Sequence, residues 1–124
     1  MSQKIANFEQ QRALHALKAA ADANRFIGKD GSQKVASKVA SMILANGFIG
    51  AMAFAISNDR EGHEAVFEAV LDHLKKSGRD YGLVTGNSRT FLKNLSEAPF
   101  DILRAITDES LAYLNYLRRF AKPE

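Results

Sequence analysis

The stretch that decides the fold is residues 107–121, TDESLAYLNYLRRFA, which combines a dense apolar stripe with a basic end. Apolar side chains recur at steps of four, seven, four and three residues; they are Ile102, Ile106, Tyr113, Leu117 and Phe120. This spacing places them on one face of an α-helix. Asp101, Asp108 and Glu109 are expected early in the helix and arginines late, the order that suits the helix dipole. The pattern predicts a long amphipathic helix that buries its stripe.

The preceding chain predicts five more helices and no strand. Their expected bounds are about 3–26, 32–46, 48–56, 58–78 and a short helix from 88, with Pro99 near the start of the last helix. Asn58 and Ser88 are the expected N-caps of the fourth and fifth helices. Gly47 and Gly50 are expected to allow close backbone approach. We therefore predict an all-α fold, a compact single-domain bundle of about six helices over residues 1–124.

Composition excludes several classes of protein. The chain has 124 residues, enough for about one domain, and it contains no cysteine. Disulfides, thiolate metal sites and cysteine nucleophiles are therefore impossible. No window approaches the roughly 18 apolar residues of a membrane span, and the first residues are polar. We expect a soluble, cytoplasmic protein without a membrane partner.

The formal net charge of +3 is unevenly distributed. Residues 1–29 hold five basic and two acidic side chains, which is the whole net excess. Glu61, Glu64, Glu68 and Asp72 form an acidic row at helical spacing, and we expect this row to be a solvated face. A basic protein with both signs interspersed can contact nucleic acid but does not have to.

Common catalytic motifs are largely absent from the sequence. The sequence His63-Glu-Ala-Val-Phe67 lacks the second histidine of a zinc-protease motif. Asp72 and His73 are neighbours on a helix and so point about 100° apart, and they do not form a catalytic pair by themselves. The glycines of residues 82–88 lack the lysine of a phosphate-binding loop. We expect no catalytic residue, no metal site and no cofactor.

Two blocks of sequence together resemble a known family. Residues 38–54 (KVASMILANGFIGAMAF) and 107–121 are similar, in order and spacing, to the small helical subunit of the type III-B CRISPR effector, the Cmr complex. That family usually has a lysine and a proline ahead of Asn-Gly-Leu and Leu-Ala-Phe, and it ends with Trp-Leu-Lys-Arg-Phe-Ala. This chain has Ala40, Phe48 and Tyr116 where the family has proline, leucine and tryptophan, and each keeps the helical pattern.

The resemblance implies a non-catalytic subunit that stacks in several copies along an RNA-guided complex. Its expected partners are the other Cmr subunits, crRNA and target RNA in the assembled complex, and further copies of itself. The residues we predict to contact RNA are Lys18, Arg25, Lys34, Lys38, Arg104, Arg118 and Arg119. Lys34 and Lys38 lie one helical turn apart, at the edge of the predicted Val35 and Val39 face.

Two other hypotheses remain open. The first is a helical adaptor or homo-oligomer with protein partners only, and its predicted partner interface is Leu111, Tyr113, Leu114 and Tyr116 on the last helix. The second is a small hydrolase that uses Glu64, Glu68 or His73. It would require these groups to converge in an apolar pocket with shifted pKa values.

Overall fold

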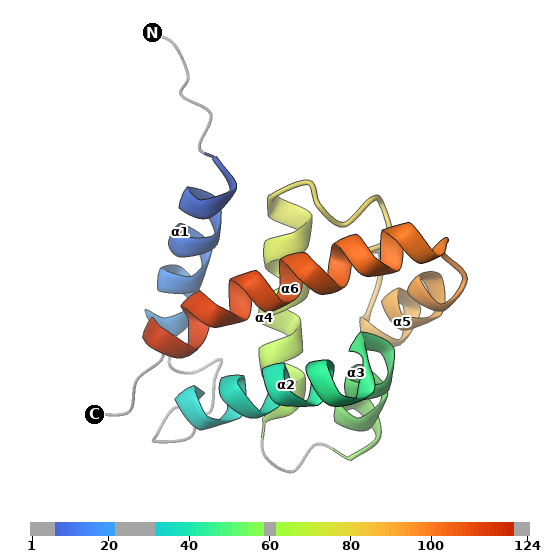
Figure 1. The fold of residues 1–124 in the computed structure, drawn as a ribbon, viewed down its shortest axis with the longest axis horizontal. Coiled ribbons are helices and arrows are strands. Elements are labelled where there is room, and N and C mark those ends of the chain that lie inside the picture. Colours follow the sequence, from blue (N-terminus) through green and yellow to red (C-terminus); the bar gives the residue numbers. More distant parts are fainter. Residues whose placement is uncertain (1–6, 22–31, 59–61, 121–124) are drawn as a thin grey trace, which may run out of the picture.

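The computed structural model describes residues 7–21, 32–58 and 62–120, and these ranges form six α-helices (Figure 1). The helices are α1 (Phe8–Ala21), α2 (Ser32–Asn46), α3 (Phe48–Ser57), α4 (His63–Lys76), α5 (Ser88–Ser96) and α6 (Phe100–Phe120). The described ranges contain no strand, which confirms the all-α fold. The first helix was predicted over about 3–26, but Asn7 is not helical; residues 3–6 and 22–26 lie outside the described residues. No described helix has the length and apolar character that crossing a bilayer requires.

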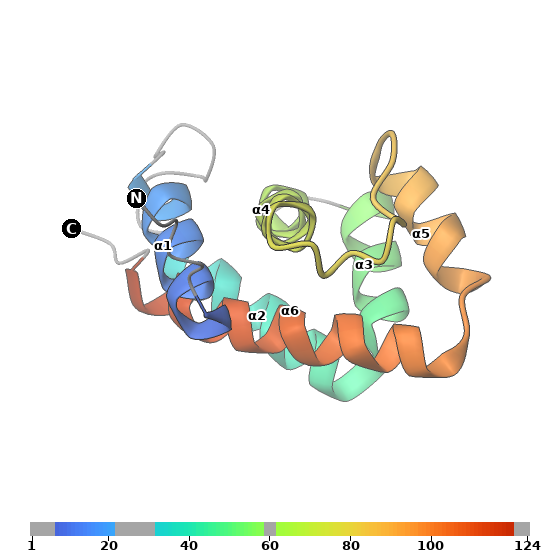
Figure 2. The ribbon, with the colours of Figure 1, turned by 90° about the horizontal axis from the view of Figure 1, so that it is seen from above.

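Helix α6 is the longest element and the one against which much of the molecule packs. Its 21 residues span about 32 Å. Helices α1, α2 and α4 all contact it, and Figures 1 and 2 show α2 lying beside α6 while α1 and α4 cross it. Ile106, Tyr113 and Leu117 of the predicted stripe are buried, as expected. Phe120, at the end of the stripe, is 37% exposed.

Three aromatic rings, from α3, α4 and α5, form one part of the core. The ring of Phe48 packs edge-to-face on Phe67 and on Phe91, with centroid distances of 5.5 and 6.1 Å. Edge-to-face packing is a favoured geometry for aromatic pairs because it opposes the positive ring edge to the negative ring face. Helix α3, which is nearly all-apolar, therefore supplies side chains to the core, with Ala51 and Met52 fully buried.

Two predicted N-caps are wrong. Asn58 is the C-cap of α3, and its backbone N–H donates to the carbonyl of Phe54; α4 is instead preceded by Gly62. Ser88 lies inside α5, whereas Asn87 is the N-cap and its Oδ1 accepts a hydrogen bond from the backbone N–H of Thr90. Asparagine and serine are similarly good N-caps. The N-cap of α5 therefore lies one residue before the predicted position, and a backbone N–H of the first turn still has its side-chain acceptor.

Gly47, between α2 and α3, and Gly50, inside α3, do not have the close-approach role predicted for them. Gly47 has φ 86° and ψ 158°, a backbone conformation open essentially to glycine alone. A Cβ at Gly47 would meet nothing within 4 Å, and one at Gly50 would make an ordinary 3.5 Å contact with Asn46. Neither position therefore needs glycine for close approach, and only Gly47 needs it for its conformation.

Replacing each of these glycines by alanine should have opposite effects on stability. Gly47→Ala is expected to lower the free energy of unfolding by roughly 1–3 kcal/mol because alanine is strained at this φ and ψ. Gly50→Ala is expected to raise it by about 0.5–1 kcal/mol because Gly50 is an exposed residue inside a helix. Urea unfolding of both variants measures the difference. Equal destabilisation would show that Gly50 has a packing role after all.

Candidate nucleic-acid interface

Helix α2 presents two of the predicted RNA-binding lysines on its surface. Val35 and Val39 are buried, at 6% and 0% exposure, and they fix the orientation of α2. Lys34 and Lys38 precede them by one residue each and are exposed. Because these lysines are four residues apart on one helix, their Cα atoms are separated by about 6 Å along its axis. The structure thus places both cations on one side of a firmly packed helix.

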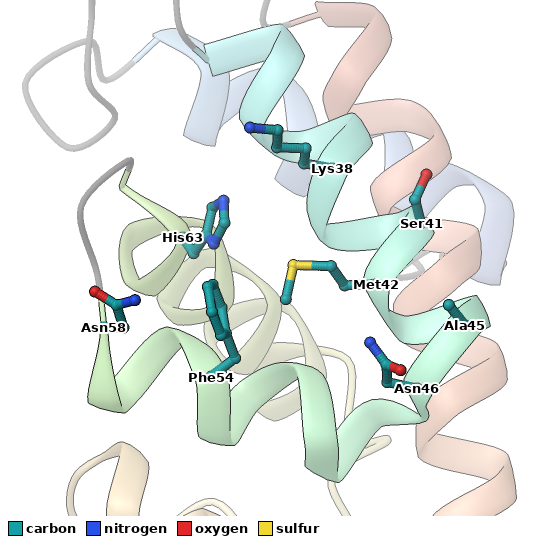
Figure 3. Close-up of a pocket in the computed structure, with 8 residues that line it drawn as sticks. All are labelled: Lys38, Ser41, Met42, Ala45, Asn46, Phe54, Asn58 and His63. Atoms are coloured by element: carbon teal, nitrogen blue, oxygen red, sulfur yellow. The ribbon is translucent and has the colours of Figure 1, made fainter.

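Lys38 lies at the edge of a cavity of about 570 Å³ between α2, α3 and the start of α4 (Figure 3). The residues that line the cavity are Lys38, Ser41, Met42, Ala45, Asn46, Phe54, Asn58 and His63. Met42 extends from α2 toward the ring of Phe54 on α3. This cavity had no signal in the sequence, because it depends on how three helices come together.

Arg118 lies in a different groove, between α2 and α6. This groove, of about 530 Å³, is lined in part by Ser37, Leu44 and Leu111. The guanidinium of Arg118 donates from Nη2 to Oδ1 of Asn115 on the same helix, at 3.2 Å. The groove has a leucine from each helix and one cation at its edge, so it is a mixed apolar and basic surface.

The other predicted RNA contacts are dispersed. Lys18 is exposed on α1 and lines a small hollow between α1 and α4. Arg104 is exposed on α6, 14 residues before Arg118, which separates the two by about 21 Å along the helix. Arg119 is exposed at the end of α6, and Arg25 lies outside the described residues. The predicted set therefore does not gather in one cavity or groove, and Lys34 and Lys38 are its best-defined pair.

The predicted partner interface on α6 is partly wrong. Tyr113 and Leu114 are 1% and 0% exposed, because both side chains belong to the core. Leu111 and Tyr116 are half-buried and still reach the surface. The hydroxyl of Tyr116 donates to the carboxylate of Glu9 on α1, at 3.1 Å. Only two of the four residues are thus available to a partner.

A buried polar cluster joins α1, α4 and α6, and the sequence did not reveal it. Glu109, which is 3% exposed, lies in the middle of α6 and not early in the helix as predicted. Arg12 of α1 donates to both of its carboxylate oxygens, at 2.8 and 2.7 Å. His73 of α4 lies 2.8 Å from the same carboxylate, and Arg79 approaches it to 3.7 Å. The carboxylate therefore holds α1 and α4 on α6.

The histidines extend this cluster. Nε2 of His73 faces Glu109, so we assign its proton to Nε2, and Nδ1 becomes an acceptor. Nδ1 of His15 lies 2.8 Å from that acceptor and donates to it. The His73 ring also stacks on Tyr113, with a centroid distance of 4.4 Å and an interplanar angle of 9°. Both ring nitrogens of His73 are thus engaged inside the protein.

The pKa values of two members of the cluster, Glu109 and His15, are lowered. Burial alone would raise the pKa of Glu109, but hydrogen bonds from Arg12 and His73 outweigh it and lower the pKa to about 2. Partial burial lowers the pKa of His15, and the neighbouring His73 and Lys76 lower it further. Glu109 is therefore a permanent anion at neutral pH.

The groups of the hydrolase hypothesis do not converge. Glu64 and Glu68 line a hollow between α4 and the loop before α5, together with Asp72 and Lys75. His73 lies in the buried cluster on α6 instead. Within residues 7–21, 32–58 and 62–120, no three histidine or carboxylate side chains are grouped so that they could hold a metal ion.

The fold and these surfaces define a small all-helical protein with exposed basic residues on several helices. A family model described as CRISPR-associated protein (Cas_Cmr5) matches residues 8–124, nearly the whole chain. The chain therefore belongs to this family, the small-subunit family of the Cmr complex. Searches of curated proteins and of solved structures found no match.

Proposed function

We propose that this chain is a non-catalytic subunit of the type III-B Cmr complex and that α2 contacts the RNA held by that complex. The observation that carries the proposal is the exposed pair Lys34 and Lys38 on a helix that the core holds in place. Family membership supplies the assembly in which such a pair would act.

The chemistry required of such a subunit is modest. In RNA-guided recognition, base pairing reads the sequence, and the protein matches the shape of the duplex and neutralises phosphates. Lysine is suited to this task because it acts as a point charge that can approach any phosphate. Two lysines about 6 Å apart along a rigid helix can therefore contact the RNA backbone without reading its sequence.

The engagement of His73 supports a non-catalytic role. A general acid or base must reach a substrate with a free ring nitrogen. In this protein Nε2 of His73 bonds to Glu109 and Nδ1 bonds to His15, so a substrate would have to displace an internal partner. The cluster therefore serves to hold α1 in place.

Contacts with other subunits, or with further copies of the chain, are assigned to the groove between α2 and α6. Leu44 on one side of it is 74% exposed, although it is a large apolar residue, and Leu111 faces it from α6. Exposed apolar side chains beside polar ones are typical of surfaces that a protein partner covers. Neither Lys34 nor Lys38 lines this groove, although Ser41 of α2 lines both the groove and the cavity beside Lys38.

Neutralising the two lysines tests the proposal. In a reconstituted Cmr complex that contains Lys34→Gln/Lys38→Gln, target RNA is expected to dissociate more readily. The slope of log affinity against log salt concentration should fall by roughly 1–2 because up to two phosphate contacts are lost. Filter binding of labelled target RNA across a salt series measures both quantities.

The matched control is Lys75→Gln/Lys93→Gln, which removes the same charge from exposed positions on α4 and α5. It should leave retention and salt slope close to those of the wild type. Equal behaviour of the two double variants would refute a specific role for α2. Failure of the lysine variant to enter the complex would instead assign Lys34 and Lys38 to a protein contact and likewise count against the proposal.

A further inference from the structure

The cavity beside Lys38 has an exposed aromatic ring in its wall. Phe54 is 42% exposed, whereas Phe48 and Met52 on the same helix are buried. Its ring packs at a tilt of 42° on the buried His63, with 5.8 Å between the ring centroids. Figure 3 shows Met42 reaching toward the ring from α2. An aromatic surface is therefore held in place by a second ring while much of it remains accessible.

Polar groups also line this cavity. Asn46 at the end of α2 and Asn58 at the end of α3 are exposed amides, and Ser41 adds a hydroxyl (Figure 3). Each amide offers both donors and an acceptor, so it can pair with the edge of any nucleobase. The volume of about 570 Å³ lies within the range of small-molecule pockets.

The charge around the cavity favours an anionic ligand. Lys38 lines it, and Lys34 lies one turn earlier on α2. None of the eight described residues that line the cavity is acidic. An aromatic face, amide groups and adjacent cations together match an unpaired nucleotide, whose base stacks on aromatic side chains while its phosphate meets a lysine.

We propose that the cavity between α2, α3 and α4 binds an unpaired base of single-stranded RNA, with Phe54 as the stacking surface and Lys38 beside the phosphate. This inference rests on the proposed function. It adds a site for an RNA base to the contact that Lys34 and Lys38 make with the RNA backbone. A peptide would be the alternative occupant, but an apolar peptide segment would leave the Asn46 and Asn58 amides unused. The RNA assignment accounts for the ring, the amides and the cation together.

Methyl NMR of the full chain tests the site directly. Met42 lines the cavity, whereas Met52 is fully buried in the core, so the two methyl groups serve as reporter and internal reference. A single-stranded RNA of about six nucleotides, titrated to millimolar concentration, is expected to shift the Met42 signal more than the Met52 signal. The same oligonucleotide with abasic central positions should leave Met42 nearly unshifted.

The matched variants are Phe54→Leu and Phe100→Leu. Leucine at position 54 keeps apolar volume but removes the stacking surface, and binding should weaken about fivefold or more. Phe100 is 72% exposed at the start of α6 and does not line the cavity, so its variant should bind as the wild type does. Circular dichroism checks that both variants remain folded.

Each other outcome overturns the base site. Equal Met42 shifts with intact and abasic RNA would show a backbone contact alone, and no shift at millimolar RNA would show that no base enters. A shift produced by another Cmr subunit and not by RNA would make the cavity a protein-binding site. Failure of the base site can be told apart from failure of the proposed function by the Lys34→Gln/Lys38→Gln experiment. If that double variant weakens RNA retention in the complex, the contact between α2 and the RNA backbone stands even without the base site.

Discussion

Replacing Glu109 by glutamine is expected to lower the free energy of unfolding by about 3 kcal/mol at pH 7. The carboxylate accepts hydrogen bonds from Arg12 and His73 and lies 3.7 Å from Arg79. Glutamine has nearly the same shape but one acceptor oxygen fewer and no charge. Its amide N–H₂ would face a guanidinium, leaving two arginines without their anionic partner.

The two arginine side chains are about a quarter exposed, at 24% and 26%, so water compensates part of the loss. This places the expected effect at the low end of the range for breaking a buried ion pair. The melting temperature should fall by roughly 10 °C. Glu68→Gln, an exposed carboxylate on α4, is the control and should change stability by less than about 0.5 kcal/mol. Similar losses in both variants would show that the cluster contributes no more than a surface charge.

Acid is expected to remove the same stabilisation from the wild-type protein. The pKa of Glu109 is lowered from 4.5 to about 2 in the folded state. A carboxylate whose pKa is lowered by folding contributes its full stabilisation at pH values above its pKa in the unfolded chain. This contribution is lost as the pH falls toward its pKa in the folded protein. The window for Glu109 is therefore pH 4.5 to about 2, and the loss is about 2–3 kcal/mol.

Urea unfolding of wild type and Glu109→Gln between pH 7 and pH 2.5 isolates this contribution, because the other carboxylates titrate in both proteins. The two stability curves should converge as pH falls below 4.5. His15 adds a weaker trend at higher pH: its pKa is lowered, so its contribution is present above about 6.5 and decreases as pH falls below that value. Parallel curves down to pH 2.5 would contradict the assignment of the acid-sensitive contact to Glu109.

The helices could be predicted because each depends on a local pattern. The 3.6-residue spacing of Ile106, Tyr113 and Leu117 fixes the buried face of α6, and the apolar run after Gly47 fixes α3. The N-caps were less certain from sequence because Asn87 and Ser88 are adjacent residues of similar capping strength. Which of them caps the helix depends on backbone angles, not on residue type alone.

The buried cluster was missed because its partners come from three separate helices. Glu109 does carry one local signal: it lies three residues after Ile106 and four before Tyr113, on the apolar face of α6. A carboxylate at a core position requires a cationic partner, but nothing local identifies that partner as Arg12, 97 residues away in the chain. The same face explains why Tyr113 is buried in the domain and cannot serve a partner.

Only the part of the candidate site that lies on α2 could be predicted from the sequence. The spacing of Lys34 and Lys38 relative to Val35 and Val39 places both lysines at the edge of a buried face, and the structure agrees. The cavity next to Lys38 depends on the angle between α2 and α3 and on the position of His63 at the start of α4. Those are tertiary features, and the apolar run of residues 48–56 contains no local sign that the ring of Phe54 is exposed.

Photo-crosslinking within an assembled Cmr complex tests the central claim most directly. Target RNA that carries 4-thiouridine would be bound, irradiated and digested, and the crosslinked peptides of this chain identified by mass spectrometry. These peptides are expected to come from residues 34–58, which cover the exposed side of α2 and the ring of Phe54 on α3. Crosslinks that fall only on other helices, or a chain that carries none while its neighbours in the complex do, would contradict it.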